Sequence, residues 1–261
     1  MTLIGIIGGS GLYDPELLEN KKTVNAKTPY GKPSDKITTG TIQGVKVAFL
    51  PRHGAKHTLN PSNIPYRANI WALKKLGCRR ILAPCAVGSL QEDVEPGTLV
   101  FPDQFIDRTY KRETTFYDKK RVCHISVAEP FCGELRERLV KSAIQQDIPY
   151  RRDGTYVCIE GPRFSTKAES RLYRGWGAHL IGMTLCPEAV LAREAELCYA
   201  PIAMITDYDT FKEQPVTTEE ILSTMKANVE KVKKLLLDAI TKIPAEREKC
   251  GCGNALKGAL I

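Results

Sequence analysis

The sequence predicts an α/β fold in a single domain, and three observations support this. Residues 179–209 read as a short apolar run, an Ala/Glu/Leu-rich segment that starts at Pro187, and a second apolar run that stops at two aspartates. That order indicates a strand, a helix and a strand. Elsewhere, apolar runs of strand length alternate with segments whose apolar residues recur at helical spacing. No internal repeat or low-complexity linker divides the 261 residues.

The expected elements follow in chain order. An apolar strand that runs into a glycine-rich loop is expected at residues 3–11, further strands at 45–50, 80–86, 98–101, 155–160 and 201–206, and a short apolar strand in the segment that starts at 179. Helices are expected at 64–76, from about 131 to 145, at the capping box of 166–169, from 187, and from 217 or 218 to about 243. Thr166 and Glu169 have the spacing of a capping box. Glu188 falls in the first turn of its helix, where a negative charge suits the helix dipole. Residues 103–115, rich in Arg, Lys and Asp, are expected to form a loop.

Composition restricts the class of protein. Hydrophobic residues make up 43% and charged residues 26%, which is ordinary for a globular chain. No apolar run approaches the roughly 18 residues that span a bilayer, and no signal peptide is recognisable, so we expect a cytoplasmic protein without a membrane partner. The net charge of +8 is scattered in short clusters. We therefore expect a solvated basic surface, which attracts phosphate-bearing ligands, and no nucleic-acid partner.

Two carboxylates mark the first candidate site. Asp207 and Asp209 follow an almost wholly apolar run, which is typical of a strand buried on both faces. In open α/β proteins, ligands bind at the carboxyl ends of such strands. A solvated turn is the alternative that spacing alone leaves open.

A second candidate site has the features of an anion site. The first strand enters a glycine-rich loop with Ser10 at its tip, and its exposed backbone N–H groups can hold an anion. The second strand ends at Arg52 and His53, and a guanidinium offers a fork of donors for phosphate. A plain surface turn is the alternative at both places.

The nine cysteines are many for a cytoplasmic protein. Most lie in apolar runs, where cysteine is usually a small buried hydrophobe. Cys250 and Cys252 differ, but one Cys-Gly-Cys is too short for the two CxxC pairs of a zinc ribbon, so no metal site is predicted. A disulfide and plain thiols both remain open for this tail.

Seven ordered motifs can be taken together: GGSG, PRHG, VGSL, CHISVAEPFC, EGPRFSTKAES, GMTLCPE and TDYD. In this order they resemble the purine nucleoside phosphorylases of the trimeric type, most closely the 5'-methylthioadenosine phosphorylase branch. The resemblance implies one phosphorylase domain over residues 1–261, with a Cys-containing tail from about 246. It also implies three layers, with a mixed, twisted central sheet flanked by helices.

The resemblance also implies roles for particular residues. The phosphate site would consist of Ser10, Arg52, His53, Cys85, Ala86 and Thr184. For the nucleoside, Met183 would face the ribose, Phe164 the base, and Asp207 and Asp209 the base edge. Ser165 and Thr218 would determine specificity, and His124 would reach the ligand of a neighbouring subunit. Cys85 departs from the family, because many relatives carry a hydroxyl residue there. Its backbone can still contact phosphate.

The chemistry of these residues indicates a reaction. Cleavage of an N-glycosidic bond gives the sugar oxocarbenium character, which bound phosphate stabilises and then attacks. Burial and a second carboxylate raise the pKa of Asp207, so it can act as general acid to the purine. Asp209, as a hydrogen-bond acceptor, matches the amino group of adenine. Apolar Met183, Ile221 and Leu222 suit a methylthio group.

We therefore expect phosphorolysis of 5'-methylthioadenosine, with inosine or guanosine as the alternative substrate. Inorganic phosphate is the co-substrate, and no metal or other cofactor is expected. A nucleoside hydrolase and a non-catalytic purine sensor are the competing classes. A homotrimer or a dimer of trimers is implied by the resemblance, and pairing of Cys250 with Cys252, or of Cys132 with Cys198, stays open.

Overall fold

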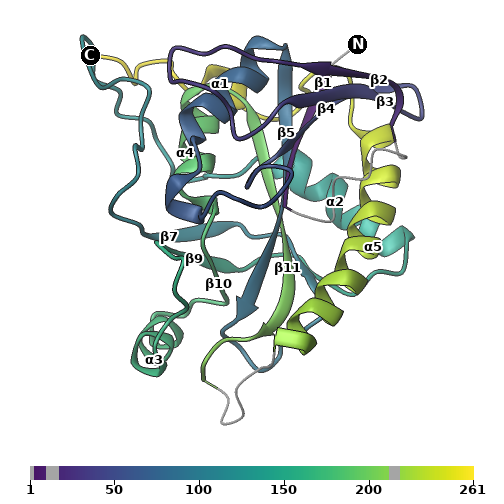
Figure 1. Ribbon diagram of the computed structural model, residues 1–261, viewed down its shortest axis with the longest axis vertical. Helices are drawn as coiled ribbons and strands as arrows, with labels where there is room; N and C mark the ends of the chain where they lie inside the picture. The colour runs from purple at the N-terminus through teal and green to yellow at the C-terminus, as the bar shows by residue number, and fades with distance from the viewer. Residues whose placement is uncertain (1–2, 10–17, 212–217) are drawn as a thin grey trace.

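The computed structural model describes residues 3–9, 18–211 and 218–261. A mixed β-sheet lies at its centre (Figure 1). The strands are β1 (Leu3–Gly8), β2 (Glu19–Val24), β3 (Ile37–Ile42), β4 (Val45–Pro51), β5 (Cys78–Ser89), β6 (Leu99–Val100), β7 (Gln104–Arg108), β8 (Tyr150–Arg151), β9 (Thr155–Ile159), β10 (Leu180–Gly182) and β11 (Cys198–Tyr208). The helices are α1 (Tyr66–Lys75), α2 (Gly133–Gln145), α3 (Lys167–Gly175), α4 (Leu185–Glu194) and α5 (Thr218–Lys242), with short 3-10 turns η2 (Pro61–Asn63) and η3 (Cys252–Asn254).

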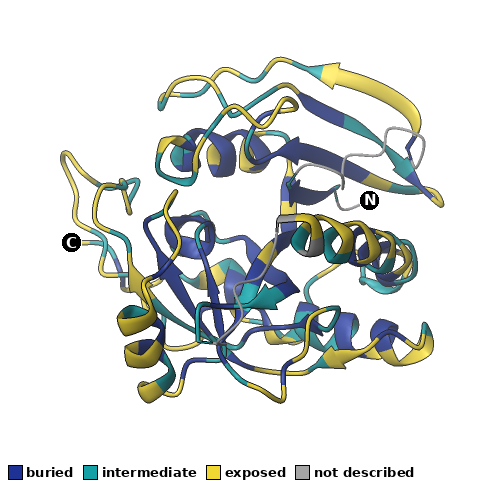
Figure 2. Ribbon diagram, turned by 60° about the horizontal axis from the view of Figure 1, so that its bottom comes forward, coloured by how far each residue is buried: buried dark blue, intermediate teal, exposed yellow. Residues whose placement is uncertain are grey.

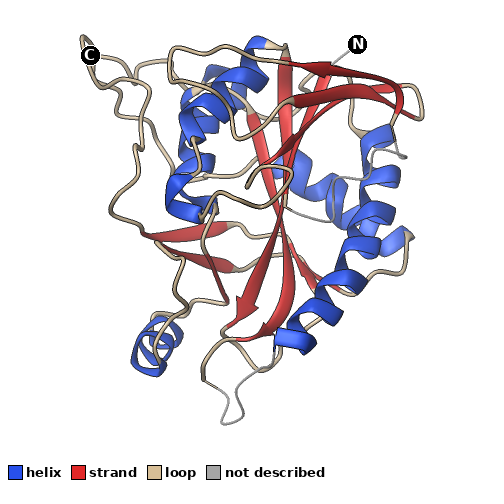
Figure 3. Ribbon diagram, in the orientation of Figure 1, coloured by secondary structure: helices blue, strands red, loops and turns tan. Residues whose placement is uncertain are grey.

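The sheet order is β2-β3-β4-β1-β5-β10-β9-β7, with β11 on β5, β6 on β11 and β8 on β6. β5 is the central strand, because it pairs in parallel with both β1 and β11 and antiparallel with β10. Helices α1 and α4 lie on one side of the sheet, and α2 and α5 on the other (Figure 3). The expected three-layer α/β fold with a mixed sheet is confirmed.

The core has two large clusters because the central strands bury both of their faces. In β4, Ala48 and Leu50 belong to the cluster with α1 and α4, whereas Val47 and Phe49 belong to the cluster with α2 and α5. Figure 2 shows this burial at the centre of the sheet, in contrast to the exposed edge strand β2. Such two-sided burial explains why the sequence shows continuous apolar runs rather than alternation.

The predicted helices are present, and the capping box of α3 has both of its hydrogen bonds. The prediction that residues 103–115 form only a loop is wrong. Residues 104–108 form β7, which pairs in parallel with β9. Its charged, half-exposed residues carry a weak strand pattern, so the pairing with β9 decides its conformation. No helix among the described residues has both the length and the apolar composition to cross a bilayer.

Candidate active site

The candidate site lies where the central strand changes its partner. The amino half of β5 pairs with β1 up to Leu82, and its last residues, Gly88 and Ser89, pair with β10. Between these pairings, on the side away from β11, the carboxyl end of β1 and the turn after β10 face one another. Ala86 is exposed although its neighbours Cys85 and Val87 are buried. A ligand that enters here therefore meets the backbone of β5 at a change of strand order, where open sheets bind ligands.

Arg52, directly after β4, is fixed by a buried ion pair. Its Nε and Nη2 donate to the two carboxylate oxygens of Glu188 at 2.8 and 2.9 Å, and the side chains are only 2% and 0% exposed. Nη1 donates to Pro84 O and Nη2 to Ile7 O, at 2.8 and 2.9 Å. Burial alone would lower the pKa of Arg52, but Glu188 raises it above its ordinary value. The guanidinium thus joins β1, β5 and α4.

This geometry changes the interpretation of two residues. The donor fork of Arg52, which the sequence argument assigned to phosphate, is held by Glu188, and four of its five N–H groups are used. Within residues 3–9, 18–211 and 218–261, the second N–H of Nη1 has no acceptor, so it is available to an anion. Glu188 is a fully buried ion-pair partner that also accepts a hydrogen bond from Tyr199 at 2.8 Å. The sequence argument gave it only a helix-dipole role, because it carried no information on burial.

His53 is a neutral imidazole beside this ion pair. Burial lowers the pKa of His53 to about 4, helped by the charge of Arg52 and by His57 and opposed by a hydrogen bond to Leu59. Nδ1 lies 2.8 Å from Leu59 O, so it carries the hydrogen and Nε2 keeps a lone pair. The ring stacks on His57, with centroids 4.4 Å apart. A neutral histidine can accept a hydrogen bond from the P–OH group of monohydrogen phosphate.

Two more residues that were predicted to bind phosphate lie near the place where β5 changes its pairing strand from β1 to β10. Thr184 follows β10 as the residue before α4; it is 8% exposed, and its side chain makes no capping hydrogen bond. Burial raises the pKa of Cys85 to about 12, so its thiol is neutral at pH 7. Met183 packs against Gly161, where an added Cβ would lie 2.6 Å from its sulfur. Ser10 lies outside the described residues.

The acidic pair lies at the carboxyl end of β11, above Gly88 of β5. A Cβ on Gly88 would lie 3.4 Å from Asp207 Oδ2 and 3.6 Å from Asp209 Cβ, so glycine leaves room for both residues. The register of β11 shifts between Ile205 and Asp207, and such a bulge redirects the following side chain.

The two carboxylates have different environments. Burial raises the pKa of Asp207; the charge of Asp209 adds to this, and the Thr206 hydroxyl, 2.6 Å away, opposes it. Asp209 is 7% exposed, and the single hydroxyl of Ser165 donates to its carboxylate, with Oγ at 2.6 and 2.8 Å from the two oxygens. The structure therefore places a carboxyl whose pKa is raised beside one that accepts a hydrogen bond from Ser165.

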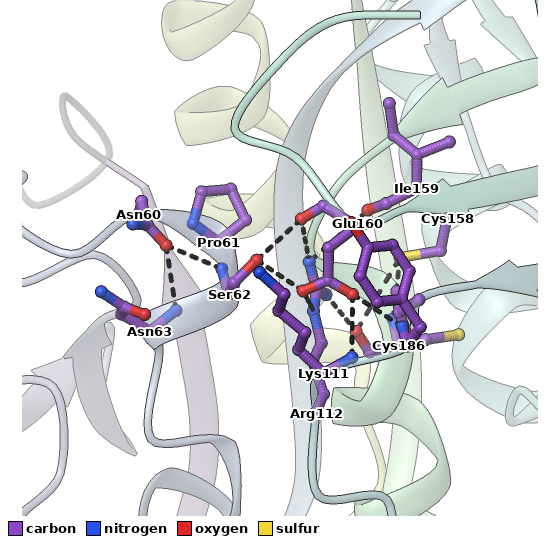
Figure 4. A network of polar contacts seen from close by, with 12 residues as sticks. Asn60, Pro61, Ser62, Asn63, Lys111, Arg112, Cys158, Ile159, Glu160 and Cys186 are labelled. Atoms are coloured by element: carbon purple, nitrogen blue, oxygen red, sulfur yellow. Dashed lines mark hydrogen bonds and ion pairs between the residues drawn. The ribbon is translucent and has the colours of Figure 1, made fainter.

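A network that sequence reasoning missed holds the loops around β9 (Figure 4). Glu160 accepts hydrogen bonds from Ser62 Oγ at 2.5 Å and from Tyr110 N at 2.7 Å. Arg112, whose side chain is 1% exposed, donates to Glu160 O at 2.6 Å and to Cys186 O. These contacts join η2, the loop after β7 and the start of α4. The signal was available, because Glu160 is a carboxylate at the end of a buried strand, as Asp207 is.

Two of the predicted site residues, Phe164 and His124, are not gathered with the others. Phe164 is 71% exposed, although its neighbour Ser165 contacts the acidic pair. His124 is exposed, and its backbone N–H bonds to Ala259 O of the C-terminal tail, whereas the chain leaves β11 at the opposite end of the molecule (Figure 1). The side chain of Thr218 lies outside the described residues. A separate hollow of about 360 Å³, lined by Tyr30, Arg67, Phe116 and Lys120 among others, contains none of the predicted site residues.

Comparison with known proteins identifies the family. The profile described as "Phosphorylase superfamily" matches residues 3–241. The chain belongs to the Phosphorylase superfamily. Among its superfamily relatives, the S-methyl-5'-thioadenosine phosphorylase of Nitrosopumilus maritimus is 56% identical over 256 residues, covering 98% of this chain and 97% of the relative.

Solved structures of methylthioadenosine phosphorylases have the same fold as this chain. A methylthioadenosine phosphorylase sourced from an antarctic soil metagenomic library superposes with a TM-score of 0.94 at 46% identity, covering 99% of this chain and 92% of the other. The methylthioadenosine phosphorylase of Schistosoma mansoni, in complex with adenine, gives a TM-score of 0.93 at 41% identity, covering 99% and 97%. The resemblance inferred from the seven motifs is confirmed.

Proposed function

We propose that the protein catalyses phosphorolysis of 5'-methylthioadenosine to adenine and 5-methylthioribose 1-phosphate. The observation that carries this proposal is the acidic pair at the end of β11, in which Asp207 has a raised pKa and Asp209 is held by Ser165. The full-length similarity to S-methyl-5'-thioadenosine phosphorylases supports the same substrate.

The anion-binding half of the site holds the nucleophile. Inorganic phosphate, as co-substrate, contacts the remaining N–H of Arg52, Nε2 of His53 and the hydroxyl of Thr184, together with the backbone near Ala86. Ser10 completes this set as a prediction from the sequence. The bound dianion lies next to the sugar, where its charge stabilises oxocarbenium character at C1'. Holding it there also removes most of the entropic cost of bringing two reactants together.

The acidic half of the site takes the leaving group. A phosphate oxygen forms the new bond to C1', and the electrons of the C1'–N9 bond pass to the purine. Asp207 donates its proton to N7, which neutralises the departing base. Asp209 accepts a hydrogen bond from the N6 amino group. No step of this scheme uses a metal or an organic cofactor.

The nucleoside also contacts apolar side chains and a residue of a neighbouring subunit. Met183 lies against the ribose, Phe164 against the base, and partly exposed Ile221 with exposed Leu222 near the 5' methylthio group. Because His124 lies with the C-terminal tail rather than with the acidic pair, we assign it to a neighbouring subunit's site in a homotrimer or a dimer of trimers. A cytoplasmic location and the absence of nucleic-acid and membrane partners stay predictions.

Initial rates of base release test the proposal. Methylthioadenosine, adenosine, inosine and guanosine are each incubated with and without inorganic phosphate. We expect phosphate-dependent release that is fastest from methylthioadenosine. Fastest release from inosine or guanosine would favour a 6-oxopurine phosphorylase, and release without phosphate would indicate a hydrolase.

Asp209→Asn is expected to weaken the preference for 6-aminopurines. An asparagine amide can donate to O6, whereas the carboxylate only accepts. One mismatched hydrogen bond in a buried site costs about 1–3 kcal/mol, so kcat/KM for methylthioadenosine should fall roughly 10- to 100-fold relative to inosine. Lys36→Gln serves as the control, because Lys36 is an exposed residue directly before β3. An unchanged ratio of the two kcat/KM values would remove Asp209 from specificity.

A further inference from the structure

The fold brings four cysteines together at the opposite end of β11 from the acidic pair. All nine cysteines lie in the described part of the chain, and none forms a disulfide. Four of them form one group, which we call the four-cysteine cluster: Cys132, Cys198, Cys250 and Cys252. Their sulfur atoms all lie within 4.8 Å of one another, and Cys198 Sγ is 3.5 Å from Cys250 Sγ.

The four ligands come from three separate parts of the fold. Cys132 is the residue before α2, and its side chain makes no capping hydrogen bond there. Cys198 is the first residue of β11 and is fully buried. Cys250 and Cys252 come from the C-terminal tail, on either side of Gly251. The cluster is therefore a point where the tail meets the body of the protein.

The spacing of the sulfur atoms matches one kind of chemistry. Tetrahedral Zn²⁺ binds sulfur at about 2.3 Å, which sets the distance between ligand sulfurs at about 3.8 Å. Cys198 Sγ and Cys250 Sγ are 3.5 Å apart and no two of the four sulfurs are more than 4.8 Å apart, which is compatible with this value. Two disulfides would instead need two sulfur pairs at about 2.05 Å. Four sulfurs that are mutually close, rather than paired, are what a shared central ion requires.

The surroundings also fit a metal thiolate centre. Three of the four thiols are buried, with Cys132, Cys198 and Cys252 at most 5% exposed. Zn²⁺ with four thiolates carries a net charge of −2, and Arg193 Nη1 lies 3.8 Å from Cys252 Sγ, where its charge offsets part of this. A dry, all-sulfur, closed set of four ligands is the pattern of a structural zinc site.

We propose that the four-cysteine cluster binds one Zn²⁺ ion that fastens the C-terminal tail to β11 and α2. Binding releases the thiol protons to solvent and involves no change of oxidation state. The tail has little other regular structure, because among the residues after α5 only η3 is helical. Its last residues pair with the segment 122–124, through Val122, His124 and an isolated bridge from Cys123 to Leu260. The ion would hold this whole corner of the molecule in place.

Metal content of the full-length, untagged protein, purified under reducing conditions, tests the proposal. We expect one zinc per chain by elemental analysis. Replacement by Co²⁺ should give the intense visible bands of tetrahedral cobalt thiolate. Zinc-free protein in which thiol titration finds four cysteines missing would show disulfides and overturn the proposal. Equimolar iron instead of zinc would overturn the choice of ion.

Variants locate the ion. Cys252→Ser and Cys198→Ala should each lose the zinc and the cobalt bands, and hydrogen exchange should rise in residues 245–261 and 122–124. Cys78→Ala is the matched control, because Cys78 opens β5 as Cys198 opens β11, and both are buried. It removes a buried thiol outside the cluster and should keep its zinc. Equal zinc in Cys252→Ser and the unmodified protein would place the ion elsewhere and refute the site.

Discussion

Asp207→Asn is expected to lower kcat by roughly 10²- to 10⁴-fold, the usual contribution of a general acid. The asparagine keeps the shape of the side chain but has no acidic proton to donate to the purine. Substrate binding should change much less, because proton transfer to N7 develops mainly in the transition state. Steady-state kcat and KM with methylthioadenosine at saturating phosphate check this. Near-normal kcat would exclude Asp207 as the acid.

The same variant should remain folded, which separates lost chemistry from lost structure. Burial raises the pKa of Asp207 in the folded protein above its unfolded value. Ionisation therefore becomes unfavourable to the folded state as the pH rises through that raised pKa. An amide does not ionise, so Asp207→Asn should be at least as stable as the unmodified protein at pH 7 and above. Thermal unfolding at pH 5 and pH 8 measures the difference.

Glu188→Gln is expected to have the largest effect on stability, a loss of about 3–5 kcal/mol in the free energy of unfolding. The substitution leaves the charge of Arg52 buried at 2% exposure without its carboxylate partner. It also weakens the hydrogen bond that Tyr199 donates at 2.8 Å. Denaturant unfolding of the variant, at fixed protein concentration, gives this free energy.

Two further variants sharpen the interpretation of Glu188. Glu246→Gln breaks the ion pair with Arg79, whose side chains are 58% and 81% exposed, and should cost less than about 1 kcal/mol. The double variant Arg52→Met with Glu188→Met should destabilise less than Glu188→Gln, because it leaves no charge unpaired. A loss below 1 kcal/mol for Glu188→Gln would contradict the buried ion pair.

The local pattern of the sequence was enough for the main elements and for the acidic pair. Apolar runs located β1, β4, β5, β9 and β11, and the position of Asp207 and Asp209 after such a run identified them as site candidates. It was not enough for β2, β3, β7 and β8, whose residues are mostly polar or partly exposed. Those strands form because a neighbouring strand supplies hydrogen-bond partners, which a local pattern does not show.

Long-range pairing also explains what was missed in the sites. Arg52 and Glu188 are 136 residues apart, so no local signal joined them. The same holds for the four-cysteine cluster. Cys250 and Cys252 were set aside as a zinc motif because no second pair stood nearby in sequence, yet the fold places Cys198, 52 residues before Cys250, at 3.5 Å from it.

In phosphorolysis, phosphate itself becomes attached to the sugar. Phosphorus NMR of a reaction with methylthioadenosine and inorganic phosphate tests this most directly, because a sugar 1-phosphate has its own resonance. We expect one equivalent of this ester to appear for each adenine released, while the inorganic phosphate signal falls by the same amount. Adenine release with an unchanged phosphate signal would contradict it.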